Sequence, residues 1–241
     1  LKTSLEEHDF TLPKARTQPL RFTDSDLVVF GTPVYAGRVP NVLLPYLNTM
    51  QGNGALAIPV VLFGNRDYDD ALIELRDILE NNGLHTIAAG AFVGEHSFSR
   101  ILAKDRPDMK DMDIVDEFVR KICEKYKTDT LSHPIPVSGT PYPYRGYYTP
   151  RDRQGTPVDI RKVKPLTNDR CNNCKHCAKV CPMGSISYKN VRELTGICIK
   201  CGACIKKCPK QAKYYEDTGY LYHQHELEEG LTRRAENTFF I

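Results

Sequence analysis

The sequence lacks the features that mark membrane-spanning, secreted and nucleic-acid-binding proteins. No run of apolar residues approaches the roughly 20 needed to cross a bilayer, and no secretory signal peptide opens the chain. Helix-turn-helix, zinc-finger and RNA-binding signatures are also missing. We therefore expect a cytoplasmic protein that neither spans a membrane nor binds nucleic acid.

Catalytic and histidine-based metal motifs are absent as well. We find no convergent set of acid, base and nucleophile, so the sequence leaves open whether the protein is an enzyme. Six of the seven histidines have no metal-binding spacing with one another or with carboxylates. We interpret these six as structural: His8, His85, His96, His133, His223 and His225.

What the sequence does contain is cysteine in a regular pattern. Eight of the nine cysteines form two runs of Cys-x2-Cys-x2-Cys-x3-Cys-Pro, CNNCKHCAKVCP from Cys171 and CIKCGACIKKCP from Cys198. Structural zinc and disulfides are the alternatives, but a zinc ribbon has two-cysteine knuckles and does not need a third cysteine and a proline in each run. The spacing predicts two 4Fe-4S clusters, in a reducing compartment where thiolates stay free to bind iron.

The remote fourth cysteine of each run is predicted to bind the cluster of the other run. Cluster I would be held by Cys171, Cys174, Cys177 and Cys208. Cluster II would be held by Cys198, Cys201, Cys204 and Cys181. His176 lies between two of these ligands, and we expect it beside the metal rather than bound to it, because all eight cysteines are present.

Charge is unevenly distributed along the chain. Residues 141–213 contain sixteen Lys and Arg against four Asp and Glu, a net charge of +12, whereas the remaining residues carry −9. Cations near a four-thiolate cluster favour its more negative, reduced form. The same basic region predicts an acidic redox protein as partner. The sequence does not determine the oligomeric state.

The N-terminal half alternates between strand and helix patterns. Short apolar runs at 26–30, 55–63 and 84–93 predict buried strands. Apolar stripes at helical spacing predict helices at 39–48, 70–82 and 112–127, the last with Cys123 as a core thiol. This order predicts an α/β domain with a parallel sheet. We divide the chain into that domain (1–132), a Pro/Tyr/Arg-rich connector (133–167) and a two-cluster ferredoxin domain with a C-terminal helix near 226–236 (168–241).

Two loops follow predicted strands, TPVYAGR from Thr32 and GNRDY from Gly64. In an open α/β sheet, ligands bind beyond the carboxyl ends of the strands, so these loops form a candidate ligand site. Each loop offers backbone amides, a glycine and a tyrosine, Tyr35 or Tyr68, whose ring can stack on a planar ligand or simply pack.

Together with the connector PYPYRGYYTPRD and the double cysteine motif, these loops resemble the EFR-type ferredoxins of anaerobic bacteria. In that family a flavodoxin-like domain is fused to a bacterial two-cluster ferredoxin. The resemblance covers almost the whole chain and implies a flavodoxin-like fold that binds flavin mononucleotide (FMN). Carried over by position, the flavin contacts would be Thr32, Pro33, Val34, Tyr35, Ala36 and Gly37 on one side and Gly64, Asn65, Arg66, Asp67 and Tyr68 on the other.

One part of the flavodoxin pattern has no counterpart in this sequence. A flavodoxin's first strand leads into a glycine-containing loop that binds the flavin phosphate at a helix N-terminus, yet no glycine precedes Gly31. The string Ser138 to Thr140 cannot serve, because Pro141 and Pro143 prevent a helix from starting there. We expect the flavodoxin-like domain to be N-terminally incomplete, or to be completed by another chain.

The leading hypothesis is therefore an electron carrier that passes single electrons through two 4Fe-4S clusters and, in an intact parent, to or from FMN. The alternative is a ferredoxin module on a flavin-free scaffold that docks to a redox partner, and the missing phosphate loop favours it. A redox enzyme with its own small substrate is a third, weaker hypothesis.

Overall fold

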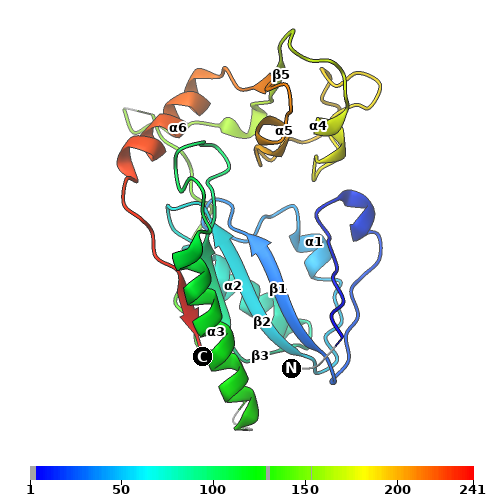
Figure 1. Cartoon of the computed structure of the whole chain (residues 1–241), viewed down its shortest axis with the longest axis vertical. Coiled ribbons are helices and arrows are strands. Elements are labelled where there is room, and N and C mark those ends of the chain that lie inside the picture. Colours follow the sequence, from blue (N-terminus) through cyan, green and yellow to red (C-terminus); the bar gives the residue numbers. More distant parts are fainter. Residues whose placement is uncertain (1–3, 129–130, 153) are drawn as a thin grey trace. The chain divides into compact units, whose positions relative to one another are not determined.

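A computed structural model describes residues 4–128, 131–152 and 154–241 (Figure 1). The chain forms two compact units, each made of two separate stretches of sequence. The cluster unit comprises Leu1–Gln18 and Pro150–His223, and the sheet unit comprises Pro19–Thr149 and Gln224–Ile241. The sequence-based boundaries differ from this division at both ends of the chain, because each end returns to a unit that is distant in sequence.

The sheet unit is built on a five-stranded mixed sheet. Strands β1 (Leu27–Pro33), β2 (Leu56–Phe63) and β4 (Ala89–Val93) lie parallel in that order, and the short β3 (His85–Thr86) also pairs with β2. The last strand, β7 (Thr238–Phe240), is antiparallel to β4. Parallel strands joined by helices make this an α/β arrangement.

Helices pack on both faces of this sheet (Figure 1). In α3 (Met109–Lys127), Phe118 and Ile122 pack against Ile58 of β2, and Asp108 caps the first turn through a reciprocal capping box. Helix α2 (Ala71–Asn81) lies along the other face, and a single short turn, α1 (Leu44–Leu47), replaces the longer helix predicted at 39–48.

A proline explains why the strand predicted at 84–93 is split in two. Pro59 lies in the middle of β2 and has no N–H to donate to the next strand. Ile87 still donates to the carbonyl of Ala57, at 3.0 Å, but its own carbonyl has no donor at Pro59. The ladder therefore breaks between β3 and β4 and resumes where Val60 faces Gly90.

Part of the sheet carries exposed apolar side chains. Among the described residues, β1 has β2 as its only partner strand. Val29 of β1 is 67 % exposed and Leu62 of β2 is 46 % exposed, so this corner of the sheet has no covering helix within the described ranges.

The first half of the connector packs on the sheet unit. The Tyr144 hydroxyl donates to Asp77 Oδ2 at 2.7 Å, and Arg145 pairs with the fully buried carboxylate of Asp70 at 2.5 Å. The Arg145 hydrogen bonds hold the pKa of Asp70 well below its usual range. These contacts fix the connector up to Thr149 rather than leaving it as a free linker.

The cluster unit has little regular structure. Its two-stranded sheet pairs β5 (Leu166–Thr167) with β6 (Lys213–Tyr214). Short helices α4 (His176–Lys179) and α5 (Ala203–Lys206) follow the cysteine turns, and 3-10 turns occupy Pro13–Arg16 and Ile160–Lys162. Helix α6 (Thr218–Gly230) begins and ends earlier than the helix predicted near 226–236.

Within the described ranges, none of the helices combines the length and apolarity that crossing a membrane requires.

Candidate metal centre

The two cysteine runs fold as near copies of one another. The third residue of each run, Asn173 or Lys200, has a left-handed backbone, and so has the fifth, Lys175 or Gly202. Each fifth residue then caps a one-turn helix, α4 or α5. These left-handed residues reverse the chain between cysteines, so that three thiols of one run turn toward a common centre.

The fourth cysteine of each run accepts a hydrogen bond from a backbone amide. The amide of Ser185 donates to Cys181 Sγ at 3.4 Å, and the amide of Ala212 donates to Cys208 Sγ at 3.3 Å. Both donors lie four residues after their cysteine. Amide hydrogen bonds of this kind stabilise a thiolate and raise the reduction potential of a cluster that it binds.

The eight cysteines line two separate cavities, four to each. The first cavity is lined by Cys171, Cys174, Cys177 and Cys208. The second is lined by Cys181, Cys198, Cys201 and Cys204. Each set therefore combines three cysteines of one run with the fourth cysteine of the other, which is the donor set that a 4Fe-4S cluster requires.

All nine cysteines lie in described residues, and none forms a disulfide. Burial raises the pKa of the Cys204 thiol to about 12 and also raises the pKa values of Cys177 and Cys201. Without a bound cation these thiols would stay neutral at pH 7. A coordinating metal deprotonates its thiol ligands outright, so the low-polarity surroundings suit a bound cluster and not free thiolates.

Positive charge is buried beside both cysteine sets. Lys213 lines the first cavity and donates to the Val191 carbonyl at 2.6 Å. Lys200, between two cysteines of the second set, donates to the carbonyls of Arg161 and Cys198, and burial lowers its pKa. Buried cations next to an anionic cluster stabilise its reduced form.

A tyrosine contacts the second set. The Tyr215 hydroxyl lies 3.7 Å from Cys198 Sγ, and its ring packs on Tyr220 with centroids 4.1 Å apart. Burial raises the pKa of Tyr215, so the hydroxyl keeps its proton and can donate it to the sulfur.

Residues 170–213 match the 4Fe-4S dicluster domain family. The match begins just before Cys171 and ends at Lys213, and so contains every cysteine of the two sets. No curated protein and no solved structure matches the chain. Residues 170–213 thus form a ferredoxin-type 4Fe-4S module, which supports iron-sulfur electron transfer.

The two predicted flavin loops lie at neighbouring strand ends. Pro33, at the end of β1, pairs in register with Leu62 of β2, so residues 32–37 and 64–68 leave the same edge of the sheet. The Thr32 hydroxyl is buried and has no hydrogen-bond partner among the residues that the structure describes. Parallel pairing thus brings together the two loops that the sequence singled out.

The side chains of these loops are nevertheless engaged by the protein itself. Arg66 pairs with Asp69 and stacks over the Tyr148 ring at 4.9 Å. Tyr68 packs against Phe63, with ring centroids 5.5 Å apart. The side chains of Arg66 and Tyr68 are therefore engaged by other residues of the sheet unit.

Glycine is used here for contacts within the chain as well. A Cβ on Gly37 would lie 2.2 Å from Asp69 Oδ2, and one on Gly64 would lie 2.5 Å from the His96 ring. The close approaches that a ligand-binding loop needs are already made by side chains of the sheet unit.

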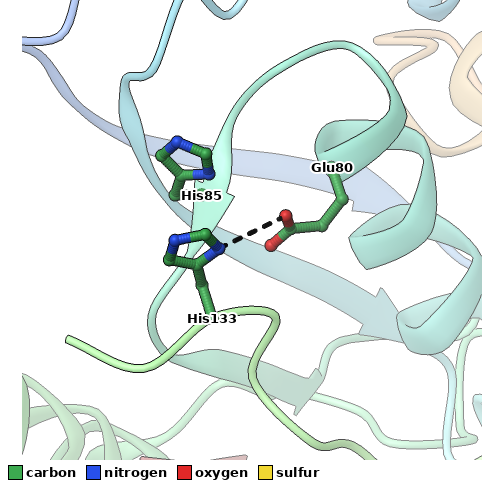
Figure 2. A group of neighbouring side chains, drawn as sticks. All are labelled: Glu80, His85 and His133. Carbon is green, nitrogen blue, oxygen red and sulfur yellow. Dashed lines mark ion pairs between the residues drawn. The ribbon is translucent and has the colours of Figure 1, made fainter.

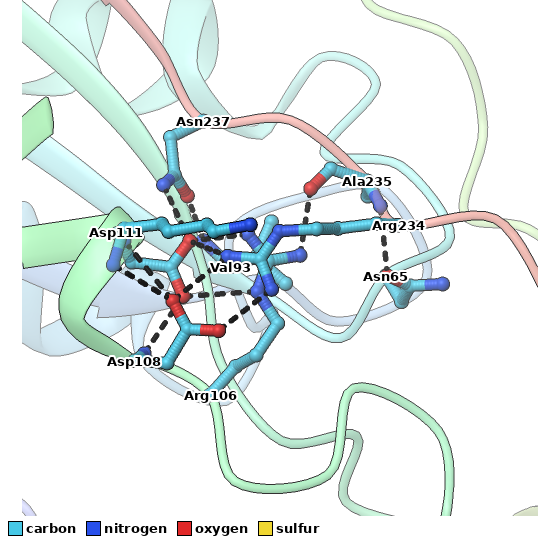
Figure 3. A network of polar contacts seen from close by, with 9 residues as sticks. Asn65, Val93, Arg106, Asp108, Asp111, Arg234, Ala235 and Asn237 are labelled. Carbon is cyan, nitrogen blue, oxygen red and sulfur yellow. Dashed lines mark hydrogen bonds and ion pairs between the residues drawn. The ribbon is translucent and has the colours of Figure 1, made fainter.

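The side chain of Asn65 is likewise engaged by residues of the sheet unit (Figure 3). Its side-chain amide donates to the carbonyls of Leu231 and Arg233. Its Oδ1 accepts from the Ala235 amide at 3.0 Å. Asn65 therefore anchors the segment that leads to β7. The sequence offered no signal for this role, since the partners lie more than 160 residues away.

Sequence reasoning also missed a contact within the cluster unit, between its N-terminal segment and the cysteine motif. Arg16 Nη2 donates to the carbonyl of Pro182 at 2.7 Å, directly after Cys181. A lone arginine carries no spacing signal that could have indicated this contact.

Proposed function

We propose that this protein is an electron carrier that holds two 4Fe-4S clusters, one in each cysteine-lined cavity. Cluster I would be bound by Cys171, Cys174, Cys177 and Cys208, and cluster II by Cys198, Cys201, Cys204 and Cys181. The observation that carries the proposal is the sorting of eight thiols into two sets of four, each drawn from both runs.

Each bound cluster supplies a one-electron redox centre. The chain contributes thiolates at fixed positions, and it shields Cys177 and Cys204 from water, since both are less than a tenth exposed. Lys213, Lys200 and Tyr215 add positive charge and a hydroxyl donor beside the sulfurs. Together these groups favour the reduced state of both clusters.

The first cavity offers a route to a partner. Cys174 is exposed, and Lys175 and Lys210 line the same cavity. Electron exchange there would suit an acidic redox protein, as the +12 charge of residues 141–213 also suggests. We expect Lys210→Glu to slow reduction of the acidic partner, and raised salt to slow the wild type in the same way.

The test is an assay of iron, sulfide and zinc on one sample of anaerobically purified protein. We expect about eight irons and eight sulfides per chain, as two cubanes require. Cys181→Ser should disturb the cluster built on Cys198, although Cys181 belongs to the other run. Cys123→Ser is the matched control and should change nothing, because Cys123 lies in α3 of the sheet unit. Zinc in place of iron, or loss of the Cys171 cluster on Cys181→Ser, would overturn the proposal.

A second candidate function adds FMN as a redox partner within the sheet unit. The neighbouring positions of residues 32–37 and 64–68 favour it, whereas the engaged side chains of Asn65, Arg66 and Tyr68 favour a flavin-free scaffold. Flavin titration of the iron-loaded protein separates the two. Quenching of FMN fluorescence with one-to-one stoichiometry supports the flavin; no quenching supports a scaffold that docks the ferredoxin module to its partner.

A further inference from the structure

Three side chains of the sheet unit come together far from the cysteines in sequence (Figure 2). Glu80 lies in α2, His85 in β3, and His133 at the start of the connector. Their ligand atoms all lie within 4.8 Å of one another. In Figure 2 both imidazoles present a ring nitrogen to the side that faces the Glu80 carboxylate.

One ring nitrogen of His85 lacks a hydrogen bond within the described residues. Its Nδ1 is buried and has no hydrogen-bond partner in the described structure. A buried polar atom without a partner is costly, and such a group calls for an explanation, such as an absent ion. The neighbouring His133 Nδ1 lies 3.8 Å from Glu80 Oε2, which is too long for a hydrogen bond.

Glu80 is held in place through its other oxygen. Oε1 accepts from the Thr86 amide at 2.6 Å and from the Thr86 hydroxyl. Thr86 in turn binds the amide of Ile135, just beyond His133. The carboxylate is thus fixed with Oε2 turned toward the histidines, an arrangement that outer hydrogen bonds give to metal ligands.

We propose that Glu80, His85 and His133 form a binding site for a divalent transition-metal ion of the zinc type. Two imidazole nitrogens and one carboxylate oxygen are ligands that Zn²⁺ accepts, at about 2.0–2.2 Å. The set contains no thiolate, so it does not compete for the iron of the cysteine cavities.

The site is open to solvent on the His133 side. The His133 side chain is 41 % exposed, so an ion and a fourth ligand reach the site from solvent. The rings of His85 and His133 now stack with centroids 4.0 Å apart. Binding therefore requires the exposed His133 ring to turn, so that both nitrogens point at one ion while His85 and Glu80 stay in place.

Such an ion would join α2, β3 and the start of the connector. An ion that binds only the folded state stabilises that state. The free energy of stabilisation grows with the logarithm of the ratio of metal concentration to dissociation constant. We thus expect zinc to protect the amides around Ile135 from hydrogen exchange.

The experiment is equilibrium dialysis of the iron-loaded protein against Zn²⁺, followed by metal analysis and zinc-edge X-ray absorption. The zinc edge reads the zinc ligands separately from iron. We expect one zinc per chain with nitrogen and oxygen neighbours and without the ~2.3 Å sulfur shell of cysteine ligation. His133→Gln and His85→Gln should each weaken binding by at least ~100-fold, and Thr86→Val by roughly 10–100-fold.

His225→Gln is the matched control, since His225 is an exposed histidine outside the site, and should bind as the wild type does. Glu80→Gln keeps an acceptor for Thr86 and should fold but bind weakly. Zinc bound through sulfur, no zinc bound by the wild type, or full binding by His133→Gln would each overturn the proposal. His133 lies on an exposed segment, so its variant remains informative if His85→Gln fails to fold.

Discussion

At the scale of single residues, the sequence predicts a functional role only for residues that recur at a regular spacing. Cysteines three residues apart followed by a proline identify a ligand set because one local turn brings them together. Tyr215 and Lys213 tune the same cavities, yet they follow the last cysteine of the motif with no pattern of their own. Their role depends on where β6 places them, which only the fold determines.

Replacing Tyr215 by Phe should make the cluster held by Cys198 harder to reduce. The change removes the hydroxyl at 3.7 Å from Cys198 Sγ and leaves the ring packed on Tyr220. A net hydrogen bond of about 0.5–1.5 kcal/mol corresponds to a shift of up to roughly 60 mV for one electron, toward more negative potential. Redox titration followed by electron paramagnetic resonance measures it.

Tyr214→Phe is the matched control for this titration. Tyr214 is the preceding residue in β6, and its side chain is on the other face of the strand. Its replacement should leave both potentials unchanged. Equal shifts in the two variants would show that the Tyr215 hydroxyl does not act on the sulfur.

At the scale of helices and strands, apolar periodicity located β1, β2, α2 and α3 to within a few residues. It failed where partners distant in sequence decide the structure. Strand β7 has three residues and forms because β4 offers it an edge, and β5 pairs with β6 across the whole cysteine motif. The break between β3 and β4 follows from Pro59 on the neighbouring strand and not from their own residues.

The start of α3 depends on a buried carboxylate (Figure 3). Asp111 is 2 % exposed and accepts hydrogen bonds from Arg106, Arg234 and Asn237. Asp111→Asn leaves the buried Arg106 without its counter-charge, so we expect the free energy of unfolding to fall by roughly 3–5 kcal/mol. Hydrogen exchange in α3 peptides measures this within the sheet unit.

The same carboxylate should give the sheet unit a defined pH dependence. The Arg106 hydrogen bonds hold the pKa of Asp111 well below its usual range. Its contribution is therefore complete above the unfolded pKa of about 3.9 and is lost as pH falls through the folded value. The protection factors of the α3 amides should fall below about pH 4 in the wild type and less so in Asp111→Asn. Glu117→Gln, which breaks an exposed pair with Lys121, should change stability by less than about 1 kcal/mol.

At the scale of the whole molecule, the two units differ in what holds them together. The sheet unit has a continuous apolar core between sheet and helices. The buried core of the ferredoxin-type module contains five residues, and two of them are the ligand candidates Cys177 and Cys204. A small core of this kind needs its metal to be stable.

Removal of iron should therefore unfold one unit and spare the other. After chelation under reducing conditions, we expect amides of residues 171–213 to lose protection from hydrogen exchange, while amides of β2 and β4 keep theirs. Reconstitution with iron and sulfide should restore the protection. A chelated protein that stays protected throughout would show that the cluster unit folds without its metal.

The return of β7 to β4 has a consequence for how the protein is made. On the ribosome, β1, β2 and β4 emerge before the cysteine motif, but the strand that pairs with β4 and the Arg234–Asp108 pair need residues that are translated after that motif. The iron-binding module is synthesised in between. Cluster insertion can thus take place on a nascent chain whose sheet is still open, so iron delivery would precede closure of the sheet.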